Sequence, residues 1–200
     1  MIDHTELSAL ARRASNGDEQ AVGEVLRRLS PVITRTARLI VGAGSWAAED
    51  AAQEALLDVA RGLSRLENPD ALWSWALRVT STRAVKIARR EAFLAFRRTS
   101  DEVEGIAAES RSERMQALRD AFDRLPTRMR AVVVLRLYVG LSEAETAEAL
   151  GCAVGTVKSQ LHEGRRRLAS MLDKQGFAPL TINAEEEQDE QKRRSSAADG

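Results

Sequence analysis

The sequence is poor in residue types that several classes of protein require. Cysteine occurs once in 200 residues, at Cys152, so an internal disulfide and a metal site built from several thiolates are excluded. With only two histidines besides, we expect neither a metal ion nor another cofactor. The apolar runs, such as residues 131–135, are too short to span a bilayer, which predicts no membrane insertion. No basic stretch followed by an apolar one opens the chain, which predicts no secretory signal and a cytoplasmic protein.

Charge and aromatic content narrow the class further. The 30 basic and 30 acidic side chains cancel, so a nucleic-acid surface must come from local clustering of cations. Aromatic residues make up 4% of the chain and charged residues 30%, and this composition favours helices over sheets. A catalytic site needs convergent titratable groups. With two histidines, one cysteine and no glycine-rich phosphate loop, we expect no enzyme.

Capping and helix-breaking residues divide the chain into a series of helices. Asp18, Ser45 and Asn68 can each cap a helix, and Ser142-x-x-Glu145 forms a capping box. A proline is tolerated at the first position of a helix but breaks its interior, so Ser30-Pro31 predicts a new helix. No alternation of apolar and polar residues predicts a strand. The expected helices lie at 18–29, 30–41, 45–66, 69–96, 110–125, onward from 126, 142–150 and 154–172.

Two changes in composition divide the chain. Residues 99–109 are acidic and poor in large apolar groups, which is typical of a linker. Beyond Gln175 the chain is too polar to bury the apolar area that would offset the entropy of ordering it. We therefore expect an all-α protein of two helical domains, 1–98 and 114–173, joined by a flexible acidic linker at 99–113 and followed by a disordered tail at 174–200.

Residues 142–168 have the features of a helix-turn-helix. Such a motif needs a small residue where the helices cross, which Ala147 supplies, and a turn residue that tolerates positive φ, which Gly151 supplies. Cys152, in the turn, is interpreted as a small buried residue. The second helix needs an apolar inner face, for which we expect Val154, Val157, Leu161 and Leu168.

The outer face of that second helix carries hydrogen-bond donors suited to phosphates and base edges. Arg165, Arg166 and Arg167 form a local positive cluster with little acid beside it. An ordinary helical hairpin would also need the alanine and the glycine, although not the basic face, and His162 could equally be a plain surface residue. The outer-face residues are Thr156, Lys158, Ser159, Gln160, His162 and Arg165.

In the first half, the expected helix at 47–66 has an acidic face. Asp50, Glu54 and Asp58 follow one another at four-residue steps, with Gln53 beside them. Like charges at this spacing repel by a few tenths of a kcal/mol per pair, about 0.2–0.5. The pattern indicates either a solvated acidic face or a surface that a basic partner relieves.

The helix expected at 69–96 begins with tryptophans and ends basic. Aromatic side chains beside cations suit single-stranded or melted nucleic acid, in which unpaired bases can stack. Core packing is the other interpretation of the tryptophans; we favour it for Trp75 and leave Trp73 open. The basic residues that follow include Arg78, Arg83, Lys86, Arg89 and Arg90.

Together these features resemble the sigma-70 family, in particular its small extracytoplasmic-function members, over residues 18–172. Asp50, Gln53 and Glu54 match the family's D-x-x-Q-E pattern, and the resemblance implies that they bind the coiled coil of the polymerase β′ subunit. The stretch 72–79 lies where the family has F-x-x-W-L-x-x-I, implicated in melting the −10 element. The loop 64–70 corresponds to the segment that captures a flipped base. The resemblance implies −10 contacts from Asn68, Trp73, Arg78, Thr82, Arg83, Lys86, Arg89 and Arg90.

The second half resembles the family's −35-reading domain. The matching stretches are G-L-S-x-x-E-T-A-x-x-L-G at 140–151 and G-T-V-K-S-x-L-H-x-G-R-x-x-L at 155–168. They imply that the outer-face residues of the second helix, named above, contact the −35 element. The chain departs from the family at three positions. Thr82 and Lys86 stand where Asn and Asp are usual, and Gln160 where Arg is common. These departures bear on the −10 preference and on one −35 contact.

The resemblance implies a function and partners. It implies a sigma factor that binds bacterial core RNA polymerase, through the β′ and β subunits, and directs promoter-specific initiation on promoter DNA. It also implies regulation by an anti-sigma protein that covers both domains. The alternative is an autonomous helix-turn-helix transcription regulator that does not bind polymerase. That alternative predicts stable duplex binding by the protein alone, together with a dimerisation surface.

Overall fold

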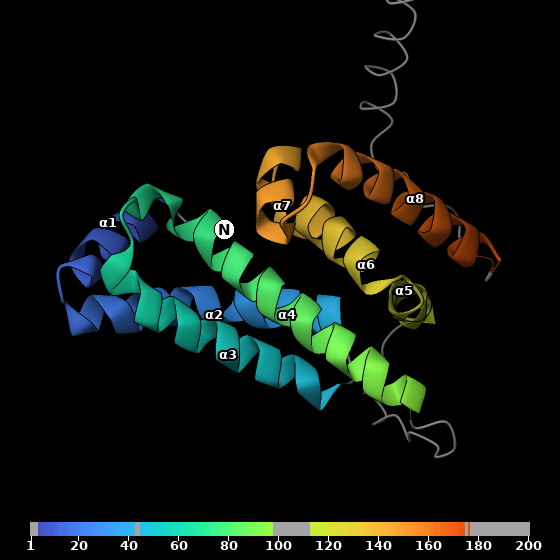
Figure 1. Ribbon diagram of the computed structural model, residues 1–200, viewed down its shortest axis with the longest axis horizontal. Helices are drawn as coiled ribbons and strands as arrows, with labels where there is room; N and C mark the ends of the chain where they lie inside the picture. Colours follow the sequence, from blue (N-terminus) through green and yellow to red (C-terminus); the bar gives the residue numbers. More distant parts are fainter. Residues whose placement is uncertain (1–3, 43–44, 98–112, 175, 177–200) are drawn as a thin grey trace, which may run out of the picture.

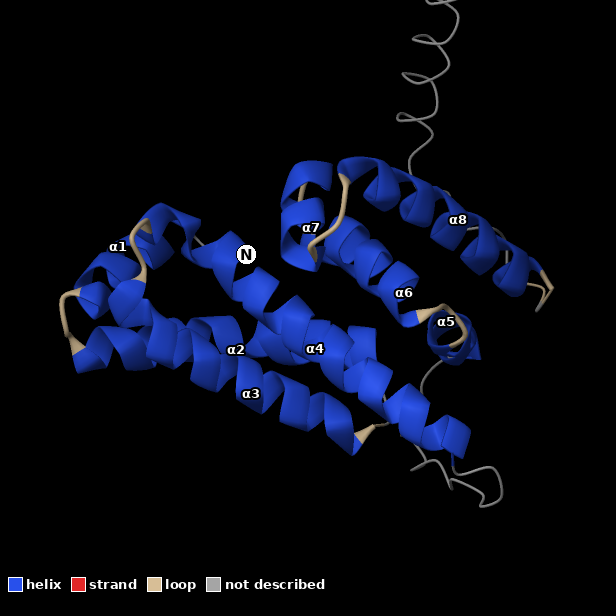
Figure 2. Ribbon diagram, viewed as in Figure 1, coloured by secondary structure: helices blue, strands red, loops and turns tan. Residues whose placement is uncertain are grey.

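A computed structural model describes residues 4–42, 45–97, 113–174 and 176, and every regular element among them is helical (Figures 1 and 2). The expectation of an all-α fold without strands is confirmed for this part of the chain. Most of the expected linker, the first residues of the helix expected at 110–125 and nearly all of the expected tail lie outside the described residues. No described helix is both long enough and apolar enough to cross a bilayer.

The first half contains α1 (His4–Ser15), α2 (Glu19–Val41), α3 (Trp46–Gly62) and α4 (Leu72–Arg97). Short 3₁₀ turns, η1 (Leu63–Arg65) and η2 (Pro69–Ala71), join α3 to α4. The core lies among α2, α3 and α4, and α1 covers one end of it (Figure 1). Helix α1 was not expected from the sequence. It is held by a buried stripe of Leu7, Leu10, Ala11 and Ala14.

Helix α2 corrects the prediction of two helices separated at Ser30-Pro31. It runs unbroken from Glu19 to Val41 with Pro31 inside it. The ring of Pro31 lies on the exposed side, while Leu29 and Ile33 on either side of it are fully buried. Burial of this apolar face outweighs the loss of one backbone hydrogen bond. The N-cap is as expected, because Asp18 accepts from the Ala21 amide at 3.0 Å.

The segment between α3 and α4 follows the expected caps with small shifts. Ser45 accepts from the Ala47 amide at 3.2 Å, and α3 ends at Gly62 rather than at Leu66. Asn68 accepts from the Asp70 amide at 3.0 Å and opens η2, after which α4 begins. A Cβ at Gly62 would lie 2.5 Å from Cζ2 of Trp75, so the indole packs directly on the end of α3. This confirms the interpretation of Trp75 as a packing residue.

The second half contains α5 (Glu113–Asp123), α6 (Thr127–Val133), η3 (Val134–Val139), α7 (Glu143–Leu150) and α8 (Val154–Asp173). Element η3 is a π-helical continuation of α6, closed by Gly140 at φ +82°. The capping box of Ser142 and Glu145 is present, and Gly151 turns the chain between α7 and α8 at φ +60°. The predicted helix-turn-helix is therefore confirmed at α7 and α8.

The core of the second half is built where α6 and α7 cross α8. Val154 is not part of it, contrary to expectation, because it lies in the first turn of α8 and is 40% exposed. Cys152 is half-buried and packs against this core. The buried members are Ala121, Leu125, Val132, Val133, Ala147, Val157, Leu161 and Leu168.

The two halves pack against each other. Leu77 of α4 is 1% exposed and clusters with Leu135, Leu141 and Ala149 of the second half. Ala131 of α6 and Val134 of η3 belong to the core of the first half. Helix α6 contacts α4 on one side and α8 on the other (Figure 1). The described residues of the two helical halves are thus in contact through a shared apolar cluster.

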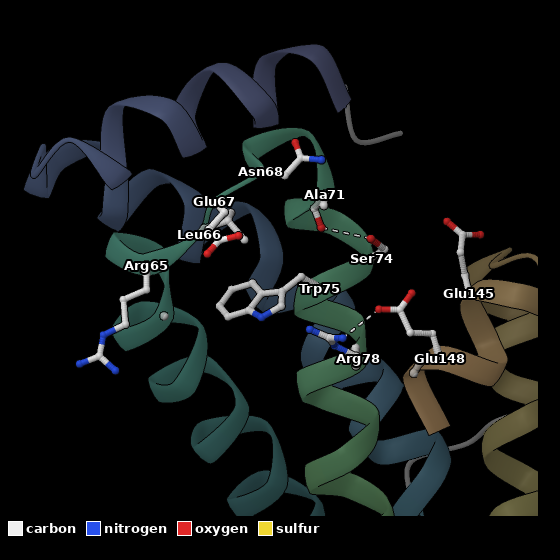
Figure 3. Close-up of a pocket in the computed structure, with 12 residues that line it drawn as sticks. Arg65, Leu66, Glu67, Asn68, Ala71, Ser74, Trp75, Arg78, Glu145 and Glu148 are labelled. Atoms are coloured by element: carbon white, nitrogen blue, oxygen red, sulfur yellow. Dashed lines mark hydrogen bonds and ion pairs between the residues drawn. The ribbon is translucent and has the colours of Figure 1, made fainter. Parts of the chain in front are cut away.

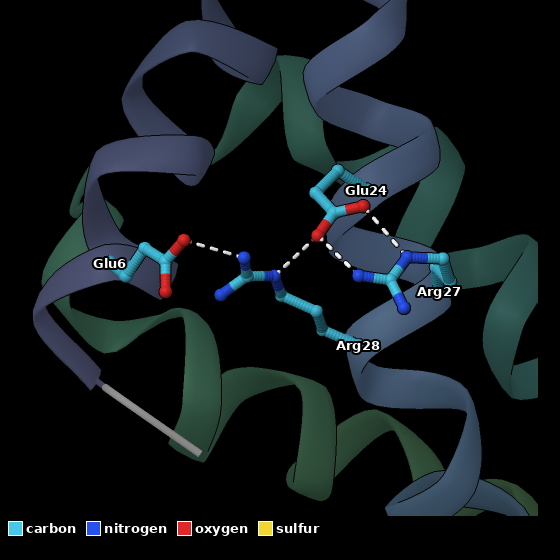
Figure 4. Close-up of polar contacts among 4 residues, drawn as sticks. All are labelled: Glu6, Glu24, Arg27 and Arg28. Carbon is cyan, nitrogen blue, oxygen red and sulfur yellow. Dashed lines mark hydrogen bonds and ion pairs between the residues drawn. The ribbon is translucent and has the colours of Figure 1, made fainter.

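Charged side chains fasten α1 to α2 (Figure 4). Glu24 accepts from Arg27 at 2.7 Å and from Arg28 at 2.6 Å, and Arg28 also donates to Glu6 of α1 at 2.5 Å. The hydrogen bonds from Arg27, and then those from Arg28, lower the pKa of Glu24 from 4.5 to about 2. A carboxyl whose pKa falls on folding stabilises the folded state above its unfolded pKa.

We therefore expect Glu24→Gln to have a lower thermal midpoint than the parent chain at pH 7. The difference in midpoint between the two chains should become smaller as the pH falls from 4.5 towards 2. Over that range the parent loses the same ion pairs by protonation. Because these groups are exposed, we expect a small difference in midpoint. Thermal unfolding followed by circular dichroism at pH 7, 4 and 3 measures it. A difference that does not change with pH would contradict the ion-pair explanation.

Gly164 lies at a close approach of α8 to α6. A Cβ there would lie 2.6 Å from Cγ2 of Val133 and 3.2 Å from Cγ of Met129. We expect Gly164→Ala to lower the free energy of unfolding by about 1–3 kcal/mol through overpacking. Gly155→Ala is the matched control in the same helix. A Cβ there meets nothing within 4 Å, so stability should be unchanged or slightly raised. Urea unfolding measures the free energy of unfolding of both variants. Equal values would contradict the close approach of α8 to α6 at Gly164.

Candidate nucleic-acid and polymerase interface

The exposed face of α3 carries two of the three residues of the D-x-x-Q-E pattern without any described partner. Asp50 and Gln53 are exposed, and no hydrogen bond or ion pair joins them to another described residue. Two apolar residues that sequence reasoning missed continue the same face at helical spacing. Trp46 is 71% exposed and Leu57 is 52% exposed. Only the structure could identify them, because an apolar residue in a helix is normally expected to face the core.

The remaining acids of α3 are paired within the chain. Arg83 of α4 donates to Asp58 at 2.5 Å and to Glu54 at 3.2 Å. The repulsion expected along this face is therefore relieved in part by α4, and a second protein is not required to relieve it. Arg83 is 33% exposed and lies between α3 and α4. It holds the acidic face in place as well as belonging to the basic series of α4.

A pocket of about 420 Å³ opens beside the loop that precedes α4 (Figure 3). Asn68, Trp75 and Arg78 line it from the first half, and Glu145 and Glu148 line it from α7. Arg78 donates to Glu148 at 2.8 Å across the boundary between the halves. Two acids of the helix-turn-helix thus stand over the residues that were expected to contact the −10 strand.

The other −10 candidates are spread along α4. Trp73 is half-buried, and its ring meets His4 of α1 edge to face at 5.1 Å, which supports a packing role at this end of the helix. Thr82, Lys86 and Arg89 are exposed and line a second pocket, which faces α6 and α7. Arg90 is exposed and does not line that pocket.

Helix α8 presents the expected outer face. Lys158, Ser159 and His162 are exposed, and Lys158 lies 3.5 Å from Glu143 of α7. The other three candidates, Thr156, Gln160 and Arg165, are half-buried at the edges of the same face. The helix packs on α5, α6 and α7, which leaves the outer face directed away from the second-half core.

The basic end of α8 corrects one expectation. Glu163 accepts from Arg166 and from Arg167, both at 2.7 Å. These hydrogen bonds, from Arg166 first and then from Arg167, lower the pKa of Glu163 from 4.5 to about 2. The arginine cluster therefore does have an acid beside it, namely Glu163. Two of its three arginines are ion-paired one helical turn from Glu163, and they offer less free charge than the sequence suggests.

A buried guanidinium joins the two halves. Arg130 of α6 is 6% exposed, donates to Asp123 at 3.1 Å and donates to the Val41 carbonyl at the end of α2 at 3.2 Å. Burial lowers the pKa of Arg130, and burial raises the pKa of Asp123 despite the nearby guanidinium. A cation is favourable at the C-terminal end of a helix, where the carbonyls carry partial negative charge. A second cation of α2, Arg35, lies 5.0 Å from the ring centroid of Tyr138 in η3.

We expect Arg130→Met to lower the free energy of unfolding by about 3 kcal/mol. The variant leaves the Val41 carbonyl without its donor and Asp123 without its cation. Arg124→Met is the matched control, because Arg124 is exposed and has no ion-pair partner among the described residues. Urea unfolding gives both values. A loss for Arg130→Met no larger than that of the control would contradict the role assigned to this contact.

Among the described residues, no three His, Cys, Asp or Glu side chains are grouped as metal ligands would be. Models of two protein families match the chain. "Sigma-70 region 2" matches residues 25–100 and "Sigma-70, region 4" matches residues 115–168. The first match covers α3 and α4, and the second covers the helix-turn-helix.

Curated relatives agree with the family models. The chain is 34% identical over 167 residues to the ECF RNA polymerase sigma factor SigM of Mycobacterium tuberculosis, covering 84% of this chain and 83% of the relative. It is 30% identical over 173 residues to SigD, an ECF RNA polymerase sigma factor of the same organism, covering 81% and 82%.

Solved structures share the fold. CnrH, in complex with the cytosolic domain of CnrY, matches with a TM-score of 0.60 at 24% identity, covering 86% of this chain and 99% of CnrH. The sigma factor RpoE, in complex with the anti-sigma factor NepR from Bartonella quintana, matches with a TM-score of 0.63 at 23% identity, covering 76% and 96%. With the family models and the relatives, the helix-turn-helix and the acidic and basic helices place this chain in the sigma-70 family, among its extracytoplasmic-function sigma factors.

Proposed function

We propose that the chain initiates transcription by dividing the work of a sigma factor between its two halves. Residues 1–98 bind core RNA polymerase and hold the −10 strand, residues 114–173 read the −35 element, and residues 99–113 connect them. The polymerase performs the chemistry, and this chain supplies binding and orientation and no catalytic group. The division follows the exposed faces of α3, α4 and α8, each of which suits one of these contacts.

The exposed face of α3 is the observation that carries the polymerase contact. It combines a tryptophan and a leucine, Trp46 and Leu57, with the unpaired groups of Asp50 and Gln53 between them. Exposed aromatic and aliphatic anchors around a few polar groups are typical of the centre of a protein interface. The acid gives the surface its sign, which fits basic side chains on the β′ and β subunits.

The face of α4 suits a melted DNA strand. Arg78, Thr82, Lys86 and Arg89 lie in sequence along it, followed by Arg90, and donors of this kind bind phosphates. The pocket beside Asn68 offers room for an unpaired base (Figure 3). Its volume of about 420 Å³ lies within the range of small-ligand pockets. In this proposal Trp73 acts through packing as much as through stacking, because its ring contacts α1.

The outer face of α8 suits the major groove of a duplex. Its N-terminal turns present Thr156, Lys158 and Ser159, with Gln160 and His162 beside them and Arg165 one turn on. A recognition helix reads base edges through residues near its N-terminus, while cations further along contact phosphates. Gln160 can pair with adenine through two hydrogen bonds, a contact that an arginine at this position would not favour.

Promoter binding requires the two halves to separate. The −10 and −35 elements lie about 25 base pairs apart, or roughly 85 Å of duplex DNA. In the structure, Glu148 of α7 is hydrogen-bonded to Arg78 of α4 at 2.8 Å, and α8 begins immediately after α7. A helix of 20 residues such as α8 spans only about 30 Å. Because about 30 Å is much shorter than the roughly 85 Å between the two elements, α4 and α8 cannot reach both elements while the halves are packed together. The packed state is therefore the state of the chain when it is not bound to a promoter.

Regulation by an anti-sigma protein is part of the proposal. One of the similar structures, RpoE, was solved in complex with an anti-sigma factor. We infer that an anti-sigma protein binds this chain in its packed state, in which the −10 face of α4 is already covered in part by α7.

We expect Asp50→Lys to weaken binding to purified bacterial core RNA polymerase about tenfold or more, because it reverses an exposed charge at the centre of the α3 face. Trp46→Ala should weaken it as well, by removing an anchor. Asp50 is preferred to Glu54 for this test, because Glu54 also holds Arg83. Asp173→Lys at the end of α8 is the matched control, an exposed acid far along the chain from α3.

Fluorescence anisotropy of labelled protein titrated with core polymerase measures these affinities. If the Asp50→Lys chain binds core polymerase as tightly as the Asp173→Lys control does, the polymerase contact does not lie on α3. A parent chain that binds no polymerase but binds duplex DNA alone would support the autonomous regulator, which the comparisons do not favour.

A further inference from the structure

A second pocket, of about 340 Å³, lies at the junction of the two halves. Helix α4 supplies one wall, the first turn of α6 a second, and the end of α7 a third. The pocket therefore exists in this form only when the halves are packed together. Its lining is Ser81, Thr82, Val85, Lys86, Arg89, Arg128, Ala149 and Leu150.

The pocket is cationic without compensation. Lys86, Arg89 and Arg128 line it, and no acidic residue does. None of these three cations has an ion-pair or hydrogen-bond partner among the described residues. This distinguishes them from Arg78 and Arg83 on the same helix, which are both paired with acids.

The usual family pattern makes this charge specific to the chain. An aspartate is usual where Lys86 stands, and it would put a carboxylate among the residues that line this pocket. Lysine at that position replaces the neutralising group by a third cation. The basic character of the pocket thus comes from one of the departures that the sequence shows, and it is not a general property of the family pattern.

The donors suit phosphate. Two guanidinium groups can each offer paired donors to phosphate oxygens, and an ammonium group adds a compact charge. The hydroxyl of Thr82 is available as a further donor, whereas that of Ser81 is already bound to the Leu77 carbonyl at 2.7 Å. Val85 and Leu150 add an apolar wall. Such a lining fits a phosphate ester with an apolar or aromatic portion, and the volume is that of a small-ligand site.

We propose that this junction binds the phosphate groups of a nucleotide-sized ligand and that the bound ligand holds the two halves together. Lys86 and Arg89 belong to α4, whereas Arg128 belongs to α6, so one phosphate group that contacts all three joins the halves. The same ligand occupies cations of α4 that the proposed −10 strand needs. Its regulatory consequence, a sigma factor kept from the promoter, rests on the proposed function. The binding itself does not.

The phosphate can come from a free nucleotide or from a DNA strand, and inorganic pyrophosphate is the probe that separates them. We expect the full chain to bind pyrophosphate in isothermal titration calorimetry at low salt, and more weakly as salt rises. Arg128→Gln should weaken this binding about tenfold, since one charged hydrogen-bonding group is lost. Arg124→Gln, an exposed arginine nearby in sequence and outside the pocket, should leave it unchanged.

A second variant guards against a fold defect in the first. Lys86→Asp restores the residue usual in the family, and we expect it to abolish pyrophosphate binding while its helical circular dichroism matches the parent. At a salt concentration that expands the parent chain, small-angle scattering should give a lower radius of gyration with pyrophosphate than without it. The Arg128→Gln chain should not respond.

A single-stranded oligonucleotide of about 12 nucleotides completes the test. No pyrophosphate binding, with oligonucleotide binding that needs Arg89 but not Arg128, would overturn the proposal, because α4 alone would then be an ordinary strand-binding face. Equal pyrophosphate affinity in the Arg128→Gln and Arg124→Gln chains would overturn it too. A chain that binds pyrophosphate through Arg128 but no polymerase would keep this inference and remove the proposed function.

Discussion

The burial of Leu77 between the two halves is the contact on which the rest of the arrangement depends. Helix α4 packs Leu72 and Ala76 into the first core and turns Leu77 towards Leu135 and Leu141 of the second half. One helix therefore contributes both to the first core and to the apolar cluster between the halves. Because the same helix carries the basic residues, packing against α4 also decides which of them remain accessible. The apolar contact thus couples the stability of the packed state to the accessibility of the basic residues of α4.

Charge is distributed unevenly across that contact. Arg130 is buried against the end of α2, and Arg78 is neutralised by Glu148, so both cations stabilise the packed state. Lys86 and Arg128, by contrast, face a common hollow without an acid. The paired cations stabilise the packed state, whereas repulsion among the unpaired cations destabilises it. The stability of the packed state should therefore change with added anions and with salt concentration. In the proposed function, opening this state exposes the α4 residues assigned to the −10 strand, and it also withdraws Ala131 and Val134 from the first-half core.

Much of the fold could be predicted from the sequence because local chemistry dictates it. The caps at Asp18, Ser45 and Asn68 and the capping box at Ser142 satisfy amides only two or three residues away, and each was found as expected. The errors arose where distant packing prevailed. Pro31 stayed inside a helix because its neighbours are buried, and helix α1 went unpredicted because its apolar stripe is short and needs α2 to cover it.

The sequence by itself determined the all-helical class, the helix-turn-helix and the family, because periodicity, capping and motif spacing are properties of contiguous residues. Tertiary structure alone decided which charges are free. Arg78 meets a partner 70 positions away, and Arg130 meets a carbonyl 89 positions away. Exposure of Trp46 and burial of Leu77 were likewise decided by what packs nearby. An ion pair or a buried side chain depends on distances in space, and these are set only when separate helices come together.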